Sequence, residues 1–152
     1  MNPDFASLLH ALYDADVRFL VVGAYALAWY GHPRATRDLD IWIEPSPENA
    51  ARLIAALRAF GAPLDGIHPG TFPQPGVALQ IGVAPVRIDI LTVLDGLTFA
   101  VAWDHRAAGE LDGLRLDFLA PDDFVRNKRA VGRKTWPTLS VSGADNGLLH
   151  GS

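Results

Sequence analysis

Apolar positions along the chain follow two different periods, and each period predicts one kind of secondary structure. Phe5, Leu8 and Leu12 recur with the spacing of an amphipathic helix. The stretch "LDIWIE" instead alternates apolar and polar side chains, as a strand with one buried face does. The expected helices cover residues 4–14, 24–30, 46–60 and 121–132. The expected strands cover residues 18–22, 39–44, 77–83, 86–93 and 114–120.

Turn and cap residues support several of these boundaries. Ser46 is a good helix cap, and Gly61 is a typical helix stop. Ala84-Pro85 separates two β-rich runs and predicts a hairpin, whereas residues 97–111 are compatible with either strand or helix. Glycine and proline fill residues 61–76, which we expect to be a loop. This mixture predicts a small α+β or α/β domain around one mixed sheet.

Composition narrows the classes of protein. The 152 residues suffice for one domain with a real core. A net charge of −4 argues against a general nucleic-acid-binding surface. The absence of cysteine argues against disulfides and thiolate zinc sites, and the scattered histidines against histidine zinc sites. The start of the chain has early acids and no apolar run of membrane length, so we expect a cytoplasmic protein without a membrane segment.

Acidic residues interrupt two apolar strands, and this is the main chemical signal. Asp38 and Asp40 lie two residues apart on an expected strand, so they project from one face at a separation of about 7 Å. Two carboxylates this close repel each other unless a cation lies between them, and magnesium prefers such oxygen ligands. Asp89 interrupts the strand "VRIDIL" in the same way. Together the three acids have the composition of a two-magnesium site.

A purely structural interpretation of these acids is also open. Asp38 could cap the start of its strand, while Asp40 and Asp89 lie on a solvated sheet face. The preceding segment favours the functional interpretation of the acids over the structural one. Gly23 joins a strand to a helix, and its backbone can approach an anion there. Arg34 and Arg37 precede the acids and are suited to phosphate oxygens.

The order "VVGAYALAWYGHPRATRDLDIWI" resembles the signature of the polymerase-β-like nucleotidyltransferase superfamily. It is most similar to a small bacterial family described as AbiEii-like or as an uncharacterised nucleotidyltransferase-fold family. The likeness continues through "RIDILT", "LDFLAPDDF" and "NKRAVGR" and covers about residues 5–133. The resemblance implies a mixed sheet with helices mainly on one side.

The resemblance also implies roles for particular residues. It makes Asp38, Asp40 and Asp89 both the magnesium ligands and the catalytic residues. Gly23 and Ala24 occupy its glycine motif. The further nucleotide-binding residues that we expect are Arg34, Thr36, Arg37 and Lys128.

Two features depart from the family pattern. Ala24 stands where a second glycine or a serine is usual, and its methyl group could crowd a triphosphate. Residues 1–133 form the expected nucleotidyltransferase domain, whereas 134–152 form an atypical tail that we expect to be poorly ordered. Deleting one guanine from codons for the family's Lys-Asp-Leu-Ala-Asp yields Lys-Thr-Trp-Pro-Thr, the residues at 134–138. We therefore consider the tail a frame-shifted relic.

The sequence thus predicts a magnesium-dependent nucleotidyltransferase that moves a nucleoside monophosphate from a nucleoside triphosphate to a hydroxyl. The acceptor is open between tRNA, a protein and a small molecule, and a toxin-antitoxin system with a cognate partner chain or a homo-oligomer fits the resemblance. One alternative is a catalytically degenerate protein that serves as a binding or antitoxin partner. Another alternative is an antibiotic adenylyltransferase.

Overall fold

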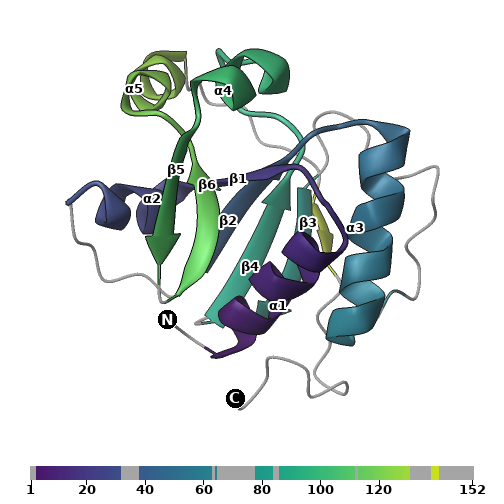
Figure 1. The fold of residues 1–152 in the computed structure, drawn as a ribbon. Coiled ribbons are helices and arrows are strands. Elements are labelled where there is room, and N and C mark those ends of the chain that lie inside the picture. Colours follow the sequence, from purple (N-terminus) through teal and green to yellow (C-terminus); the bar gives the residue numbers. More distant parts are fainter. Residues whose placement is uncertain are drawn as a thin grey trace.

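The computed structural model describes residues 3–31, 38–62, 64, 78–83, 86–111, 113–130 and 138–140. The helices in these residues are α1 (Pro3–Asp14), α2 (Gly23–Trp29), α3 (Pro47–Phe60), α4 (Phe99–His105) and α5 (Pro121–Ala130). The strands are β1 (Phe19–Val22), β2 (Asp38–Ile43), β3 (Ala78–Val83), β4 (Val86–Leu91), β5 (Ala107–Leu111), β6 (Leu114–Phe118) and β7 (Thr138–Ser140). Figure 1 shows how these elements are arranged.

The described strands form a single mixed sheet in the order β5-β6-β1-β2-β4-β3-β7. β2 pairs parallel with β4 and antiparallel with β1. β3 and β4 pair antiparallel, as the expected hairpin around residues 84–85 requires. The predicted α+β fold with a mixed sheet is therefore confirmed.

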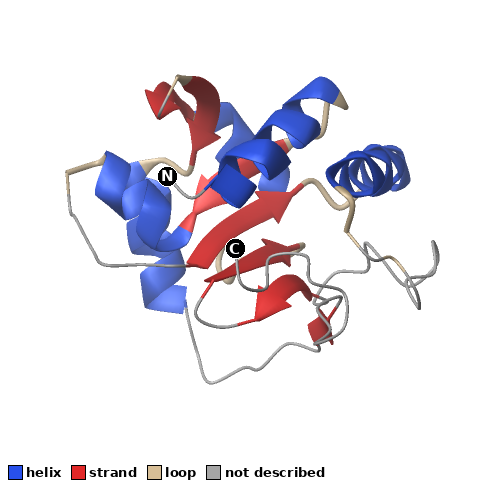
Figure 2. Ribbon diagram, turned by 90° about the horizontal axis from the view of Figure 1, so that it is seen from below, coloured by secondary structure: helices blue, strands red, loops and turns tan. Residues whose placement is uncertain are grey.

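The larger core lies between the sheet and the helices α1 and α3, which lie side by side in Figure 1. Leu8 and Leu12 of α1 and Leu53 of α3 are fully buried there, against alternate residues of β2 such as Ile41. This arrangement matches the expectation of helices mainly on one side. Figure 2, seen from below, shows the strands crossing the middle of the molecule with helices outside them.

A smaller core covers part of the opposite sheet face. The buried indole of Trp42 on β2 meets Phe99 of α4 edge to face, with ring centroids 5.1 Å apart. Because Trp42 follows Asp40 by two residues, it projects from the same face of β2 as that acid. The acids therefore lie on the sheet face that α4 leaves partly open.

The segment that was ambiguous between strand and helix contains both. α4 ends at His105, and β5 begins at Ala107. Within the expected tail, Thr138–Ser140 form β7, which pairs parallel with β3, while the rest of 134–152 lies outside the described residues. Within the ranges given above, no helix has the length and apolar character needed to cross a bilayer.

Candidate functional site

Strand pairing brings the three acids of the sequence analysis together. In the register of β2 and β4, Asp40 stands directly opposite Asp89, and Asp38 stands opposite Arg87. Leu39 and Ile41 point the other way and are buried in the larger core. Asp38, Asp40 and Asp89 therefore share one sheet face, although they come from positions about 50 residues apart in the chain.

Arg87 already lies between two of these acids. Its Nη2 is 3.3 Å from Asp38 Oδ2, and its Nε is 3.3 Å from Asp89 Oδ1. Gln80 of β3 also donates from Nε2 to Asp89 Oδ1 at 3.2 Å. Arg87 and both acids are partly exposed, so these ion pairs are weak enough to rearrange. One guanidinium thus supplies positive charge where the sequence predicts a metal.

Asp40 is the most perturbed of the three acids. Burial raises its pKa from 3.8 to about 7, and repulsion from the neighbouring Asp89 carboxylate adds to this rise. A hydrogen bond with Asp89 and the charge of Asp38 raise the pKa further, while Arg87 lowers it. Near neutral pH the Asp40 carboxyl is therefore divided between its protonated and ionised forms. Additional positive charge at this site would favour the ionised form.

Gly23 forms the turn beside Asp40. It has φ +68°, a conformation that residues with side chains rarely adopt. A Cβ atom at this position would run into the Asp40 carboxylate, since Val22 pairs with Asp40 across β1 and β2. α2 begins at Gly23, and Val22 provides no side-chain cap for its first turn. The bare backbone can therefore approach an anion close to Asp40.

A pocket of about 690 Å³ opens in front of this turn. Gly23, Asp40 and Lys128 of α5 are among the residues that line it. Apolar side chains complete it, including Leu27, Leu91, Leu94, Leu119 and Phe124. The structure therefore brings Lys128 to the pocket that Asp40 lines, whereas Asp38 and Asp89 are not among the lining residues. Arg34, Thr36 and Arg37, which we expect from the sequence to bind the nucleotide, lie outside the described residues.

Sequence reasoning missed Arg87 and Gln80. The signal for Arg87 was present, because a residue two positions before Asp89 on the same strand shares its face. Its partner Asp38 belongs to another strand, so only the register of β2 and β4 reveals the pairing. Gln80 faces Asp89 through the equivalent register of β3 and β4.

The donor set can be tested against the expected magnesium. As the described side chains lie, no three histidine, aspartate or glutamate residues are arranged to hold a metal ion. The arrangement instead pairs Asp38 and Asp89 with Arg87. The chemistry of the donors nevertheless fits magnesium, because Asp38, Asp40 and Asp89 present carboxylate oxygens on one sheet face and magnesium prefers such oxygen ligands. Movement of the Arg87 side chain would open the site to a cation.

Comparisons with known proteins support the fold. No family model matches the chain, and no curated protein matches it. A crystal structure from Thermotoga maritima of a protein described as a candidate nucleotidyltransferase matches with a TM-score of 0.55 and 15% sequence identity. The match covers 85% of this chain and 88% of that one. At this identity the likeness concerns architecture alone, and it shows that the chain shares the fold of that protein.

Proposed function

We propose that the protein is a magnesium-dependent nucleotidyltransferase that moves a nucleoside monophosphate from a nucleoside triphosphate to a hydroxyl. One observation carries this proposal: Asp38, Asp40 and Asp89 meet on one sheet face beside the Gly23 turn. The fold shared with a candidate nucleotidyltransferase supports the same function.

In the proposed reaction, the hydroxyl oxygen of the acceptor forms a bond to the α-phosphorus, and the bond to the β-phosphate oxygen breaks. Asp38, Asp40 and Asp89 would hold magnesium, which supplies positive charge to the phosphates and the leaving pyrophosphate. Asp89 orients the attacking hydroxyl and takes up its proton. Gly23 leaves room for the phosphates, and Lys128, which lines the same pocket, adds positive charge. Arg34, Thr36 and Arg37 complete the proposed nucleotide site.

The acceptor class follows from the resemblance in the sequence rather than from the site. We propose a tRNA or protein acceptor, a cytoplasmic location, and membership of the AbiEii-like family with a cognate toxin or antitoxin partner. An antibiotic acceptor remains the enzymatic alternative. Resistance of a sensitive host that expresses the protein would identify that alternative.

A second function is favoured by a specific observation. Arg87 already pairs with both Asp38 and Asp89, and Ala24 follows the Gly23 turn. Both features suit a protein that has kept the scaffold and lost catalysis, and that acts by binding another chain. The two functions differ in whether magnesium and a nucleotide displace Arg87 from the acids.

Calorimetry separates these functions without knowledge of the acceptor. ATP, GTP, CTP and UTP are titrated into the full chain with magnesium or with a chelator. The transferase proposal requires magnesium-dependent binding of at least one nucleotide, and loss of that binding in Asp40→Asn and Asp89→Asn. Arg58→Gln, an exposed change on α3 remote from the acids, is the matched control.

Transfer itself is then measured with α-³²P nucleotides and mixtures of total tRNA or cell protein. Label must appear in an acceptor with the wild-type chain and disappear with Asp40→Asn. Magnesium-independent labelling that survives in Asp40→Asn would rule out the proposed roles of the acids. Absence of magnesium-dependent nucleotide binding would instead support the binding-partner function.

A further inference from the structure

A second pocket, of about 550 Å³, lies at the other end of β1 from the acids. Four of the eleven arginines in the sequence line it, and each comes from a different part of the chain. Arg18 precedes β1, Arg52 lies on α3, Arg106 follows α4, and Arg115 lies on β6. Such convergence of arginines in a chain of net charge −4 calls for a ligand or a structural reason.

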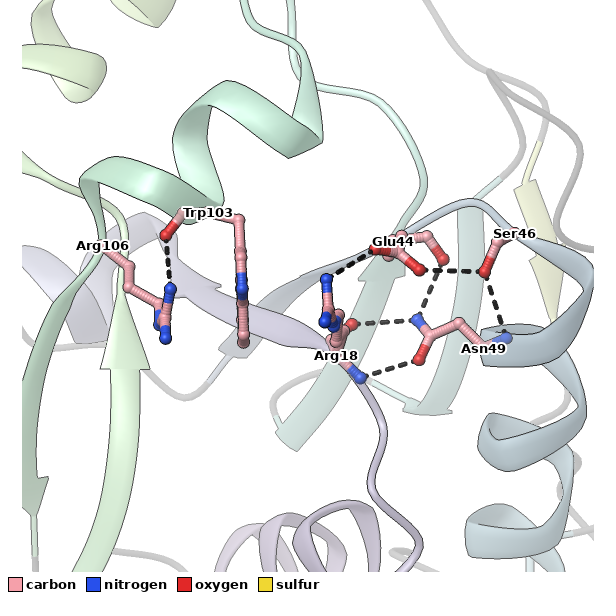
Figure 3. Close-up of polar contacts among 6 residues, drawn as sticks. All are labelled: Arg18, Glu44, Ser46, Asn49, Trp103 and Arg106. Carbon is pink, nitrogen blue, oxygen red and sulfur yellow. Dashed lines mark hydrogen bonds and ion pairs between the residues drawn. The ribbon is translucent and has the colours of Figure 1, made fainter.

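Two of these arginines have structural partners that hold them in place. The Trp103 ring has the Arg106 guanidinium 4.0 Å from its centroid and the Arg18 guanidinium 5.4 Å away, one on each side in Figure 3. Arg18 also pairs with Glu44 at 3.4 Å, and Arg106 with Asp117 at 3.5 Å. Their guanidinium groups are thus positioned in advance, with part of each still exposed.

The other two arginines are differently placed. Arg52 and Arg115 are exposed, and neither makes a hydrogen bond or ion pair with another described residue. The acids in the pocket wall are Asp16 and Asp117, and the latter is engaged by Arg106. Among the lining residues, four arginines face two acids, and Glu44, the partner of Arg18, lies outside the lining. The donors of the arginines match phosphate oxygens, which guanidinium groups bind in pairs.

We propose that this arginine pocket binds a compact phosphate-bearing anion, independently of the nucleotidyltransferase site. Its volume is that of a small-molecule site, so we expect a compact ligand rather than an extended nucleic-acid backbone. Tyr13, whose residue surface is 60% exposed, also lines it and offers a ring to a nucleoside base. Arg18 and Gly23 flank opposite ends of β1, about 16 Å apart, so one phosphate group cannot occupy both sites.

Calorimetry with a chelator present tests the pocket apart from any metal-dependent site. Inorganic pyrophosphate and ATP are titrated separately into the full chain, into Arg52→Gln/Arg115→Gln and into Arg58→Gln. Arg58 lies on the same helix as Arg52 but does not line the pocket, so it is the matched control. We expect the double variant to weaken pyrophosphate binding at least tenfold, with the control unchanged. If the natural ligand is a nucleotide, Tyr13→Ala should weaken the binding of ATP and leave the binding of pyrophosphate unchanged. If it is a simple phosphate, Tyr13→Ala should leave the binding of both unchanged.

The outcomes are decisive in both directions. Binding that persists in the double variant, or that is lost in Asp40→Asn, would overturn the proposal, since the anion would then bind elsewhere. Binding of a long RNA without binding of pyrophosphate or ATP would overturn it in favour of a nucleic-acid surface. Thermal melting confirms that each variant folds, and the single variant Arg115→Gln replaces the double one if that variant does not. Failure here leaves the transferase proposal untouched, because its test depends on magnesium and Asp40.

Discussion

At the scale of single residues, the electrostatics of the site are most evident in the raised pKa of Asp40. Its carboxyl is partly buried, faces Asp89 across the sheet, and has a pKa raised to about 7. Between about pH 4 and pH 7 the folded protein therefore binds a proton more tightly than the unfolded chain does. The free energy of unfolding contributed by this group falls as pH rises through that window, and the loss is complete above it.

Replacement of Asp40 by asparagine should remove this penalty. In the absence of metal we expect Asp40→Asn to be about 2 kcal/mol more stable than wild type at pH 8, because each pKa unit corresponds to about 1.4 kcal/mol and the unpaired amide offsets part of the gain. The difference should shrink towards pH 4. Urea unfolding at several pH values measures it. A variant that is less stable than wild type at pH 8 would contradict the assignment of the raised pKa.

Arg87 offers a second prediction at the same scale. Its loss in Arg87→Gln removes one cation that pairs with Asp38 and Asp89, so we expect the metal-free variant to lose about 1 kcal/mol at pH 8. Magnesium should stabilise this variant more than it stabilises wild type, because no guanidinium competes for the acids. Melting curves with and without magnesium, with Arg58→Gln as control, measure both effects. An equal increase in melting temperature with magnesium in the two chains would show that Arg87 does not compete with magnesium for the acids.

Single residues were predictable from the sequence where they violated a pattern. Asp40 and Asp89 stood out because a carboxylate inside an apolar strand is costly. Arg87 did not break the apolar pattern of its strand, because an arginine near the start of a strand is common. Its significance depends on which residue of the partner strand it faces. Its role became apparent only once Asp38 was seen opposite it.

Among the secondary-structure elements, α3 is anchored by one buried polar residue near its start. Asn49 is fully buried; its Nδ2 donates to the backbone oxygens of Arg18 and Glu44 at 2.9 Å each, and its Oδ1 accepts from Arg18 N at 2.7 Å. Ser46 accepts from Asn49 N at 3.2 Å and caps the helix. These bonds, drawn in Figure 3, join the helix to the ends of β1 and β2.

Asn49→Ala should therefore cost more stability than an ordinary cap mutation. It removes three hydrogen bonds and leaves buried backbone groups without partners, for which we expect a loss of about 3 kcal/mol. Ser46→Ala removes only a cap and should cost about 1 kcal/mol. Denaturant unfolding of both variants at one pH compares them. Equal losses of stability in the two variants would mean that the hydrogen bonds of Asn49 to Arg18 and Glu44 contribute no more than the helix cap does.

Elements with one consistent period were predictable, as α1 and the hairpin of β3 and β4 show. Residues 97–111 were not, because their alanines and apolar residues suit either structure. Packing of Phe99 and Ala102 against the smaller core selects a helix there, and pairing of β5 with β6 selects a strand after it. These are long-range choices that no local pattern contains.

For the molecule as a whole, ligands of the folded state should raise its stability. If the transferase proposal holds, magnesium and a nucleotide together should raise the melting temperature more than the sum of either alone, because Asp40, a proposed magnesium ligand, lines the same pocket as Lys128. A ligand at 100 times its dissociation constant adds about 2.7 kcal/mol. Scanning calorimetry measures the shift, and Asp40→Asn should abolish the synergy. Purely additive shifts would indicate separate magnesium and nucleotide sites.

The facing positions of Asp40 and Asp89 have a consequence for how active molecules arise. Were β4 to slide by one residue along β2 during folding, Ile88 or Ile90 would come to stand opposite Asp40, and the opposing carboxylate would be lost. A molecule with this shifted register would therefore lack the proposed transferase activity. If the transferase proposal holds, measured activity would therefore report the fraction of molecules in which β2 and β4 have paired in the correct register.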